Sequence, residues 1–522
     1  MMALEACALL HQPLHESVKR SPRKCALVCG ARRLSYSELM NQVDLLAQAL
    51  RARNVRSGDR VVLFLDNSIE MVSGLYAVLS LGAVAVPVNP LTKPGKLAHL
   101  LEDSGAIAML TQGSLAPAWR EALAHAPLVQ TCWLSSASAV SDDPRVVPWP
   151  EASVANAPNA ADADGSALAA IIYTSGTTGA PKGVMLTHHN MLSAARSVNA
   201  YLAMNEHDVI LSALPMAFSY GLYQVLIGLA VGATVVLERN FSFPAKVLEV
   251  MATERATVFP GVPTMFAQWM GMKSLDRYPL DALRLVTSAA APLPPAQIAW
   301  LRASFPQAQL YSMYGQTECK RISYLPPEQL DIRPDSVGRG IPNQALWLVD
   351  ERGRRLPNGS TGELAVHGPH VMQGYWRKPE ETAQRLKRCP ETGETVLHTG
   401  DIFRTDADGW LYFVARRDDI IKSRGEKVSP REVENALHAI EGVCEAAVIG
   451  VPDPALGEAV KAYVTLQPGV QLTERDLIKH CLARLESYMV PKYVEIVPAL
   501  PKTDSGKITK APLRAATATT SP

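Results

Sequence analysis

Short apolar runs rich in β-branched residues alternate with segments whose apolar positions recur at helical spacing. Arg60–Leu65 and Ala83–Val88 predict buried strands, and the residues near Ile69–Leu79 between them predict a helix. The next strand is predicted at Ala106–Leu110, and Ser35–Glu38 has the form of a capping box that opens an earlier helix. This strand–helix–strand alternation predicts an α/β fold.

The same alternation resumes in the middle of the chain, before a turn predicted at Pro260–Pro263. Ligands of such sheets bind beyond the carboxyl ends of the strands, so each strand end is a candidate wall of one crevice. The predicted strands are Val209–Leu214, Ala233–Leu237, Ala256–Phe259 and Leu283–Thr287.

Composition excludes several classes of protein. The 522 residues include 51 basic and 50 acidic side chains, so the net charge of +1 provides no general attraction to nucleic acid or anionic membranes. Eight cysteines in so long a chain are too sparse for a disulfide framework and favour a reducing cytoplasm. Residues 1–20 lack the features of a signal peptide. The most apolar window, Val72–Val88, is interrupted by polar residues, Gly and Pro, which favours a buried helix and strand over a membrane span.

The first candidate for chemistry is the stretch Tyr173–Gly183, which follows a predicted buried strand at Ala167–Ile172. Its glycines permit tight turns, and its hydroxyls and Lys182 supply the donors and the positive charge that a polyphosphate needs. A plain Ser/Thr/Gly-rich surface loop is the simpler alternative. A Walker-type loop is poorly supported, because Ala180-Pro181 separates the glycine from the lysine.

Four further segments follow in order, and with the first they resemble the adenylate-forming enzymes: acyl-CoA synthetases, luciferases and the adenylation domains of peptide synthetases. The resemblance covers nearly the whole chain, and a small departure in these segments is Ala415-Arg416, where the family usually has Gly-Arg. The four segments are Tyr311–Glu318, His398–Asp401, Ala415–Gly425 and Pro501–Lys507.

The resemblance implies a role for each matching residue. Lys507, Glu318, Thr174 and Lys182 are the expected catalytic residues, and Glu318 is the expected ligand of a Mg²⁺ ion that bridges the phosphates of ATP. Lys507 would bridge the substrate carboxylate and the α-phosphate. By resemblance Tyr314 stacks on adenine, Thr317 touches the α-phosphate and Asp401 accepts hydrogen bonds from the ribose. The expected nucleotide-binding residues are Thr174, Ser175, Gly176, Thr177, Thr178, Gly179, Lys182, Ala289, Ala290, Tyr314, Gly315, Thr317, Asp401, Arg416 and Lys507.

The resemblance also implies the domain organisation. A large N-terminal domain with mixed sheets, residues 1–417, would bind the nucleotide and the acid. A small, mobile α+β domain, residues 418–522, would pivot at the hinge Asp418, and Gly425 would then line the tunnel for the thiol. A non-catalytic nucleotide-binding module is the alternative, but such a module would be expected to lose Lys507 or Glu318.

The expected reaction joins a carboxylate to AMP, releases pyrophosphate and passes the acyl group to a thiol. CoA is the first choice of acceptor, and the phosphopantetheine of a carrier protein is the alternative. Leu214–Gly221 contains no acidic residue to pair with an ammonium group, which favours an aliphatic or aromatic monocarboxylate over an α-amino acid and leaves proline open. Many acyl-CoA synthetases have histidine where Phe218 stands. The expected acid-binding residues are Phe218, Tyr220, Gly221, Gly261, Val262, Ser288, Met313 and Gln316.

Overall fold

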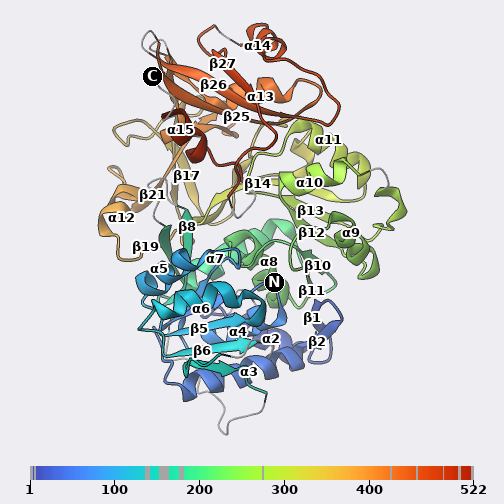
Figure 1. The fold of residues 1–522 in the computed structure, drawn as a ribbon, viewed down its shortest axis with the longest axis vertical. Helices are drawn as coiled ribbons and strands as arrows, with labels where there is room; N and C mark the ends of the chain where they lie inside the picture. Colours follow the sequence, from blue (N-terminus) through green and yellow to red (C-terminus); the bar gives the residue numbers. More distant parts are fainter. Residues whose placement is uncertain are drawn as a thin grey trace. The chain divides into compact units, whose positions relative to one another are not determined.

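The computed structural model of the protein divides into two compact units (Figure 1). The larger unit comprises Met1–Ala345, Val366–Lys387 and Thr395–Leu397, and the smaller one comprises Leu346–Ala365, Arg388–Glu394 and His398–Pro522. The structure describes residues 4, 7–135, 141–151, 164–175, 181–272, 275–423, 426–453, 456–485, 487–503 and 507–518.

A nine-stranded sheet of the larger unit carries the strand ends that the sequence singled out. Its order is β16-β15-β14-β13-β12-β10-β11-β1-β2. The strands from β14 to β1 run parallel to their neighbours, whereas β15, β16 and β2 are antiparallel. The strands are β1 (Cys25–Cys29), β2 (Arg32–Ser35), β10 (Val209–Ser212), β11 (Thr234–Leu237), β12 (Val258–Gly261), β13 (Leu285–Ser288), β14 (Gln309–Gln316), β15 (Cys319–Leu325) and β16 (Arg339–Gly340).

The second sheet of this unit has eight strands in the order β19-β9-β8-β4-β3-β5-β6-β7. The strands from β8 to β7 run parallel to their neighbours. At the other edge of the sheet, β9 pairs antiparallel with β8, and β19 pairs antiparallel with β9. The strands are β3 (Arg60–Phe64), β4 (Val84–Pro87), β5 (Ala108–Gln112), β6 (Thr131–Ser135), β7 (Val146–Pro148), β8 (Leu168–Ser175), β9 (Pro181–Thr187) and β19 (Gly374–Tyr375).

Two helices connect these sheets. Helix α4 contacts β1 of the first sheet and β3 and β4 of the second, and α7 contacts β15 as well as β8 and β9. Almost all of α4 is buried, which explains why its sequence is apolar on every side. The helices of this unit are α2 (Gln12–Arg20), α3 (Tyr36–Ala52), α4 (Ile69–Ser80), α5 (Pro94–Ser104), α6 (Ala116–Ala124), α7 (His188–Leu202), α8 (Ser219–Val231), α9 (Pro244–Thr253), α10 (Pro263–Met270), α11 (Pro295–Ser304) and α12 (Pro379–Arg385).

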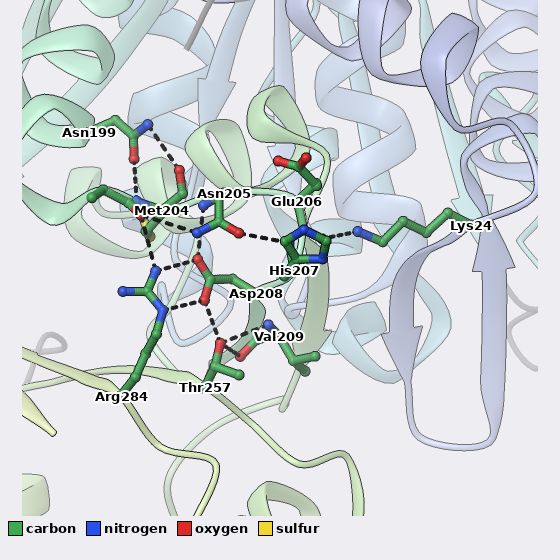
Figure 2. Close-up of polar contacts among 11 residues, drawn as sticks. Lys24, Asn199, Met204, Asn205, Glu206, His207, Asp208, Val209, Thr257 and Arg284 are labelled. Atoms are coloured by element: carbon green, nitrogen blue, oxygen red, sulfur yellow. Dashed lines mark hydrogen bonds and ion pairs between the residues drawn. The ribbon is translucent and has the colours of Figure 1, made fainter. Parts of the chain in front are cut away.

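A buried carboxylate, Asp208, joins the amino ends of three neighbouring parallel strands (Figure 2). Arg284 donates to both of its oxygens, at 2.8 and 2.5 Å, and the Thr257 hydroxyl donates at 2.7 Å. Because Asp208, Thr257 and Arg284 each directly precede a strand (β10, β12 and β13), this cluster fixes where the three strands begin. Burial alone would raise the pKa of Asp208, but these hydrogen bonds and one from the backbone of Asn205 lower it.

A third sheet has the order β17-β18-β21-β20, and β22 pairs with β21. In the smaller unit β21 and β22 are antiparallel, with Asp401 opposite Arg416. The strands are β17 (Ala345–Val349), β18 (Thr361–His367), β20 (Leu386–Arg388), β21 (Thr395–Thr405) and β22 (Leu411–Arg416).

The C-terminal part of the smaller unit is an α+β fold around a sheet of order β24-β23-β26-β25, with β27 beside β26. In one hydrophobic core, residues of α13 and α14 pack against residues of this sheet, and a second hydrophobic core includes Leu513 of α15. The elements are β23 (Ile421–Ser423), β24 (Glu426–Val428), α13 (Pro430–His438), β25 (Val443–Asp453), β26 (Gly457–Leu466), α14 (Glu474–Leu482), β27 (Tyr493–Ile496) and α15 (Ala511–Ala518).

The structure confirms the α/β prediction, the mixed sheets and a large domain followed by a smaller α+β fold. The capping box is formed, since Ser35 accepts from Glu38 N–H and the Glu38 carboxylate accepts from Ser35. The turn predicted at Pro260–Pro263 is shorter, because β12 keeps its parallel register with β13 through Gly261 and α10 begins at Pro263. In the described part of the chain, no helix is both long and apolar enough to cross a membrane.

We expect Asp208→Asn to lower the free energy of unfolding by about 2–3 kcal/mol, because it leaves Arg284 without a charged partner. Urea unfolding measures this change. The matched control is Asp281→Asn, since Asp281 pairs with Arg255 on the surface, where the two side chains are 67% and 70% exposed. That pair should contribute less than about 1 kcal/mol. Equal losses in the two variants would contradict a special role for the buried cluster.

Two buried histidines, His11 and His188, make the stability of the fold depend on pH. The His188 Nδ1 accepts the backbone N–H of Leu10 at 3.0 Å, and burial lowers the pKa of His188 to about 4 and that of His11 to about 3. Both pKa values lie below the ordinary 6.5, so the neutral rings stabilise the fold above pH 6.5, and this contribution is lost as the pH falls towards 4.

The free energy of unfolding should therefore fall by about 2 kcal/mol per histidine between pH 6.5 and 5. Urea titrations over this range measure the slope. His188→Asn should reduce the slope of stability against pH by the contribution of one histidine, whereas the same change at the exposed His207 should leave the slope unchanged. A wild-type protein whose stability is constant over this range would contradict the prediction.

Candidate functional site

The described parts of the stretch Tyr173–Gly183 are the end of β8 and the start of β9, which pair antiparallel. Thr174 pairs with Lys182 across the two strands, and its hydroxyl donates to the Lys182 carbonyl at 3.4 Å. Lys182 thus lies on a strand rather than at the start of a helix, so its charge is not supplemented by a helix dipole. The Ser175 side chain and Gly176, Thr177, Thr178 and Gly179 lie outside the described residues, so their predicted roles stay predictions.

Tyr375, which the sequence analysis did not single out, contacts both Lys182 and the predicted metal ligand Glu318. Its hydroxyl donates to Glu318 Oε1 at 2.8 Å, and the Lys182 Nζ lies 5.5 Å from the centre of its ring. Burial and the neighbouring Glu318 carboxylate raise the pKa of Tyr375, so the phenol stays protonated and donates. One aromatic side chain therefore holds Lys182 and Glu318 close to each other.

The position of Tyr375 follows from the pairing of β19 with β9, in which Tyr375 lies opposite Val184. The next residue, Trp376, donates its backbone N–H to Gly183 at 2.7 Å and its indole N–H to the Asp103 carbonyl at 2.9 Å. The Tyr173 hydroxyl bonds to the Asp103 carboxylate. A side chain at Gly183 would lie 2.7 Å from Ile171 and 3.3 Å from Trp376, so a glycine is required there.

The donors at this point suit a magnesium ion bound together with a polyphosphate. Mg²⁺ is commonly held by one or two carboxylates plus phosphate oxygens rather than by a cage of protein ligands. Glu318 supplies one carboxylate, oriented by Tyr375. Among the described residues no group of three or more His, Cys, Asp or Glu side chains could hold a metal ion, which is compatible with a single protein ligand.

Four of the residues predicted to bind the nucleotide lie at or just beyond the carboxyl ends of β13 and β14, and Tyr314 is the one predicted to stack on adenine. Tyr314 is on β14, and the Gln316 side chain donates to its hydroxyl at 3.3 Å. Ala289 and Ala290 follow β13, and Ala290 has a φ of 76°. Thr317 is in the turn from β14 to β15, directly before Glu318.

The predicted acid-binding residues come from the carboxyl ends of adjacent parallel strands and the start of α8. Gly261 pairs with Ser288 across β12 and β13, and the Tyr220 hydroxyl bonds to the Thr287 hydroxyl at 2.7 Å. Burial raises the pKa of Tyr220 to about 12. A side chain at Gly221 would collide with the carbonyls of residues 214 and 215, so only glycine permits this approach. Phe218 is the residue before α8, Val262 follows β12, and Met313 is on β14, where its Sδ lies 3.2 Å from the Tyr201 hydroxyl.

Two buried cations beside Tyr220 were missed by the sequence analysis. Lys320 and Arg321 follow the motif on β15, and each is only 4% exposed. The Arg321 guanidinium lies 4.9 Å and the Lys320 Nζ 5.3 Å from the centre of the Tyr220 ring. Adjacent residues of a strand point to opposite faces, so no strand pattern could have placed both beside one ring.

In the smaller unit, the predicted ribose ligand Asp401 is buried and lies 3.7 Å from Arg416 Nε. Glu363 is a further residue that the sequence analysis missed. Its carboxylate accepts the backbone N–H of Gly400 at 2.8 Å and contacts the His398 Nδ1 at 3.2 Å, so it holds the part of β21 that carries Asp401. Burial raises the pKa of Glu363, but the bonds from His398 and Gly400 outweigh burial and lower it.

Lys507 is exposed, and its backbone N–H donates to the Thr503 hydroxyl at 3.2 Å. Lys502, in the same segment, pairs with Glu445 at 2.7 Å. Asp418 falls in a short 3₁₀ turn at Arg417–Asp419, and Gly425 lies outside the described residues. The roles of Lys507, the hinge and the thiol tunnel stay predictions, as does the domain boundary at 417/418.

Known proteins resemble this chain over nearly its full length. The family model "AMP-binding enzyme" matches residues 14–376, and that of the "AMP-binding enzyme C-terminal domain" matches residues 432–507. Feruloyl-CoA synthase of Amycolatopsis sp is 34% identical over 501 residues, which is 95% of this chain and 96% of the relative. 4-Coumarate–CoA ligase 5 of Oryza sativa subsp. japonica is 32% identical over 528 residues, or 97% and 94% of the two chains.

A similar solved structure is an anthranilate CoA ligase in complex with anthranoyl-AMP. It superposes with a TM-score of 0.88 at 28% identity and covers 99% of each chain. The fold and the assembled groups define a nucleotide-dependent activating enzyme. The chain belongs to the AMP-binding enzyme family, and it is an AMP-forming acid–thiol ligase.

We expect Tyr375→Phe to weaken the binding of the Mg²⁺ that adenylation requires, because the variant keeps the aromatic ring near Lys182 while the Glu318 carboxylate loses its hydrogen-bond donor. The Mg²⁺ concentration for half-maximal ATP–pyrophosphate exchange should rise about 5- to 10-fold, which corresponds to about 1–1.4 kcal/mol for one hydrogen bond to a charged group. Saturating Mg²⁺ should recover most of the rate. Tyr173→Phe, which removes a hydroxyl bonded to Asp103 instead, is the matched control and should leave the Mg²⁺ requirement unchanged.

Proposed function

We propose that the protein activates one carboxylate of an aliphatic or aromatic acid with ATP and transfers the acyl group to the thiol of CoA. In the first step a carboxylate oxygen bonds to the α-phosphorus, the bond to the bridging oxygen breaks, and pyrophosphate leaves. In the second step the thiol sulfur bonds to the acyl carbon, AMP leaves with the electron pair of the broken bond, and the thiol proton passes to solvent.

The observation that carries this proposal is the arrangement of Lys182, Tyr375 and Glu318. The Lys182 Nζ lies 5.5 Å from the centre of the Tyr375 ring, and the hydroxyl of this ring donates to Glu318 at 2.8 Å. This arrangement supports the proposal, because a positive charge and an oriented carboxylate are the groups that a polyphosphate and its metal ion require. Glu318 would hold a Mg²⁺ ion, which supplies charge neutralisation between the phosphates. The protein needs no covalent nucleophile, because positioning and charge neutralisation suffice.

The remaining roles follow the motifs. Tyr314 and Ala289–Ala290, at the carboxyl ends of β13 and β14, are proposed to bind adenine, and Asp401 with Arg416 the ribose side of the nucleotide. Lys507 is proposed to neutralise the two anions that meet in the first step. The domain that follows Asp418 would then turn, withdraw Lys507 and bring the loop of Gly425 to the thiol.

CoA is the proposed acceptor because the full-length relatives in this comparison are named as a CoA synthase and a CoA ligase. The phosphopantetheine arm of a carrier protein presents the same thiol and is the alternative. An acid without an ammonium group is proposed because Leu214–Gly221 contains no carboxylate and because the cations Lys320 and Arg321 beside Tyr220 would repel an ammonium group.

The proposal is tested by ATP–pyrophosphate exchange across a panel of acids, followed by transfer to CoA and to a carrier protein. Lys507→Ala should lower exchange by about 10²-fold or more while it leaves the transfer from synthetic acyl-adenylate to CoA largely intact. Lys502→Ala, in the same segment but paired with Glu445, is the matched control and should retain exchange. Equal loss of both half-reactions in Lys507→Ala would contradict its assignment, and an α-amino acid as the best substrate would contradict the proposed acid.

A further inference from the structure

Arg321 combines two costly features at one position. Its side chain is only 4% exposed, and its backbone adopts the left-handed conformation with a φ of 57°. Left-handed backbone is uncommon outside glycine, asparagine and aspartate, and a buried charge without a charged partner is strongly unfavourable. Such costs persist where the surrounding structure enforces them, which is frequently at a functional site.

The surroundings of Arg321 do enforce this conformation. Gly315 of β14 lies against it so closely that a side chain at Gly315 would come within 2.8 Å of the Arg321 Cα. The register of β14 and β15 also shifts between Tyr314 and Gln316, as at a β-bulge. The left-handed residue and the bulge turn the guanidinium towards Tyr220, where an ordinary strand would direct it to the opposite face from Lys320.

The guanidinium has donors without acceptors. Its Nε is buried and has no hydrogen-bond partner, and no carboxylate among the described residues pairs with Arg321. Its contact is with the face of the Tyr220 ring, 4.9 Å away, and this ring is fixed by the bond from Tyr220 to Thr287. A cation–π contact offsets only part of the loss of hydration of a guanidinium.

We propose that Arg321 is a specificity residue that binds a second anionic group of the acid, an inference that rests on the proposed acid-activating function. The substrate is then an acid with a carboxylate or an equivalent anion on its far end, and one of its carboxylates is activated. The planar guanidinium binds a carboxylate through paired hydrogen bonds, which gives its unsatisfied donors their acceptors.

The chemistry around Tyr220 supports an anion at this place. Lys320 lies on the same ring and 4.7 Å from the centre of the Tyr223 ring, and its Nζ donates to the Ser219 carbonyl at 2.9 Å. Two buried positive charges within reach of one tyrosine raise the potential felt by a ligand there and favour negative charge. The same field disfavours the ammonium group of an amino acid.

The experiment compares ATP–pyrophosphate exchange for butyrate, hexanoate and benzoate with that for succinate, adipate and terephthalate. The acids form three pairs: butyrate with succinate, hexanoate with adipate, and benzoate with terephthalate. In the wild-type protein, kcat/KM for the dicarboxylate of at least one pair should exceed that for its monocarboxylate by about 30-fold or more, which is the effect of one charge-assisted hydrogen-bonded pair. Arg321→Met should reduce that ratio to about threefold or less through a raised KM for the acid, with the KM for ATP unchanged. Arg321→Lys, which keeps the charge, should retain part of the preference.

Thermal unfolding provides a second readout that separates binding from structure. Removing a buried charge without a charged partner is often neutral or stabilising, so Arg321→Met should melt at or above the wild-type temperature in the absence of substrate. A dicarboxylate should stabilise the wild-type protein against heat and leave Arg321→Met unaffected. Arg255→Met, at an exposed arginine paired with Asp281, is the matched control and should behave as wild type in both assays.

The outcomes separate the two proposals. Exchange with none of the acids would overturn the proposed function itself. Exchange with monocarboxylates at rates equal to or above the dicarboxylates, unaltered in Arg321→Met, would overturn the role of Arg321 and leave the acid-activating function in place. A raised KM for ATP with an unchanged acid preference would assign Arg321 to the nucleotide, and loss of stability in Arg321→Met would assign it to the fold.

Discussion

The buried carboxylate of Asp208 fixes the relation between three strands on whose far ends the site is built. It joins the residues that precede β10, β12 and β13, and each strand is about four residues long. Since strands rise about 3.3 Å per residue, an error in register at the amino ends would move the carboxyl ends by a similar distance. A hydrogen bond tolerates a few tenths of an ångström, so the geometry of the candidate site depends on a cluster at the opposite ends of these strands.

Charge organises the two sides of the site differently. In the part proposed to bind phosphate, Lys182 and Glu318 are of opposite sign and both contact Tyr375, so their charges balance each other without a ligand. Near Tyr220, the Lys320 and Arg321 side chains both carry positive charge, and the contact of Arg321 with the aromatic ring is only a weak substitute for an anion. The first arrangement suits a ligand that arrives with its own metal ion, and the second suits a ligand that brings negative charge.

Much of this architecture could be predicted from sequence. The buried strands were predicted because they have continuous apolar runs, and the family was predicted because each of its motifs is contiguous in the chain. Tyr375, Glu363 and Arg321 were missed for a physical reason, since each acts through contacts made across strands. The left-handed backbone of Arg321 depends on the absence of a side chain at Gly315, six residues earlier, and the pairing of β19 with β9 depends on segments nearly two hundred residues apart.

The short strand β19 has a consequence for how the protein is made. Trp376 and Asp103, 273 positions apart, are joined by a hydrogen bond, and Tyr375 contacts both Lys182 and Glu318. During synthesis the ribosome therefore releases both sheets of the larger unit almost completely before the residues that connect the phosphate site emerge. The nascent chain should therefore pass most of its synthesis before Tyr375 can contact Lys182 and Glu318, and these contacts can form only after Trp376 has left the exit tunnel.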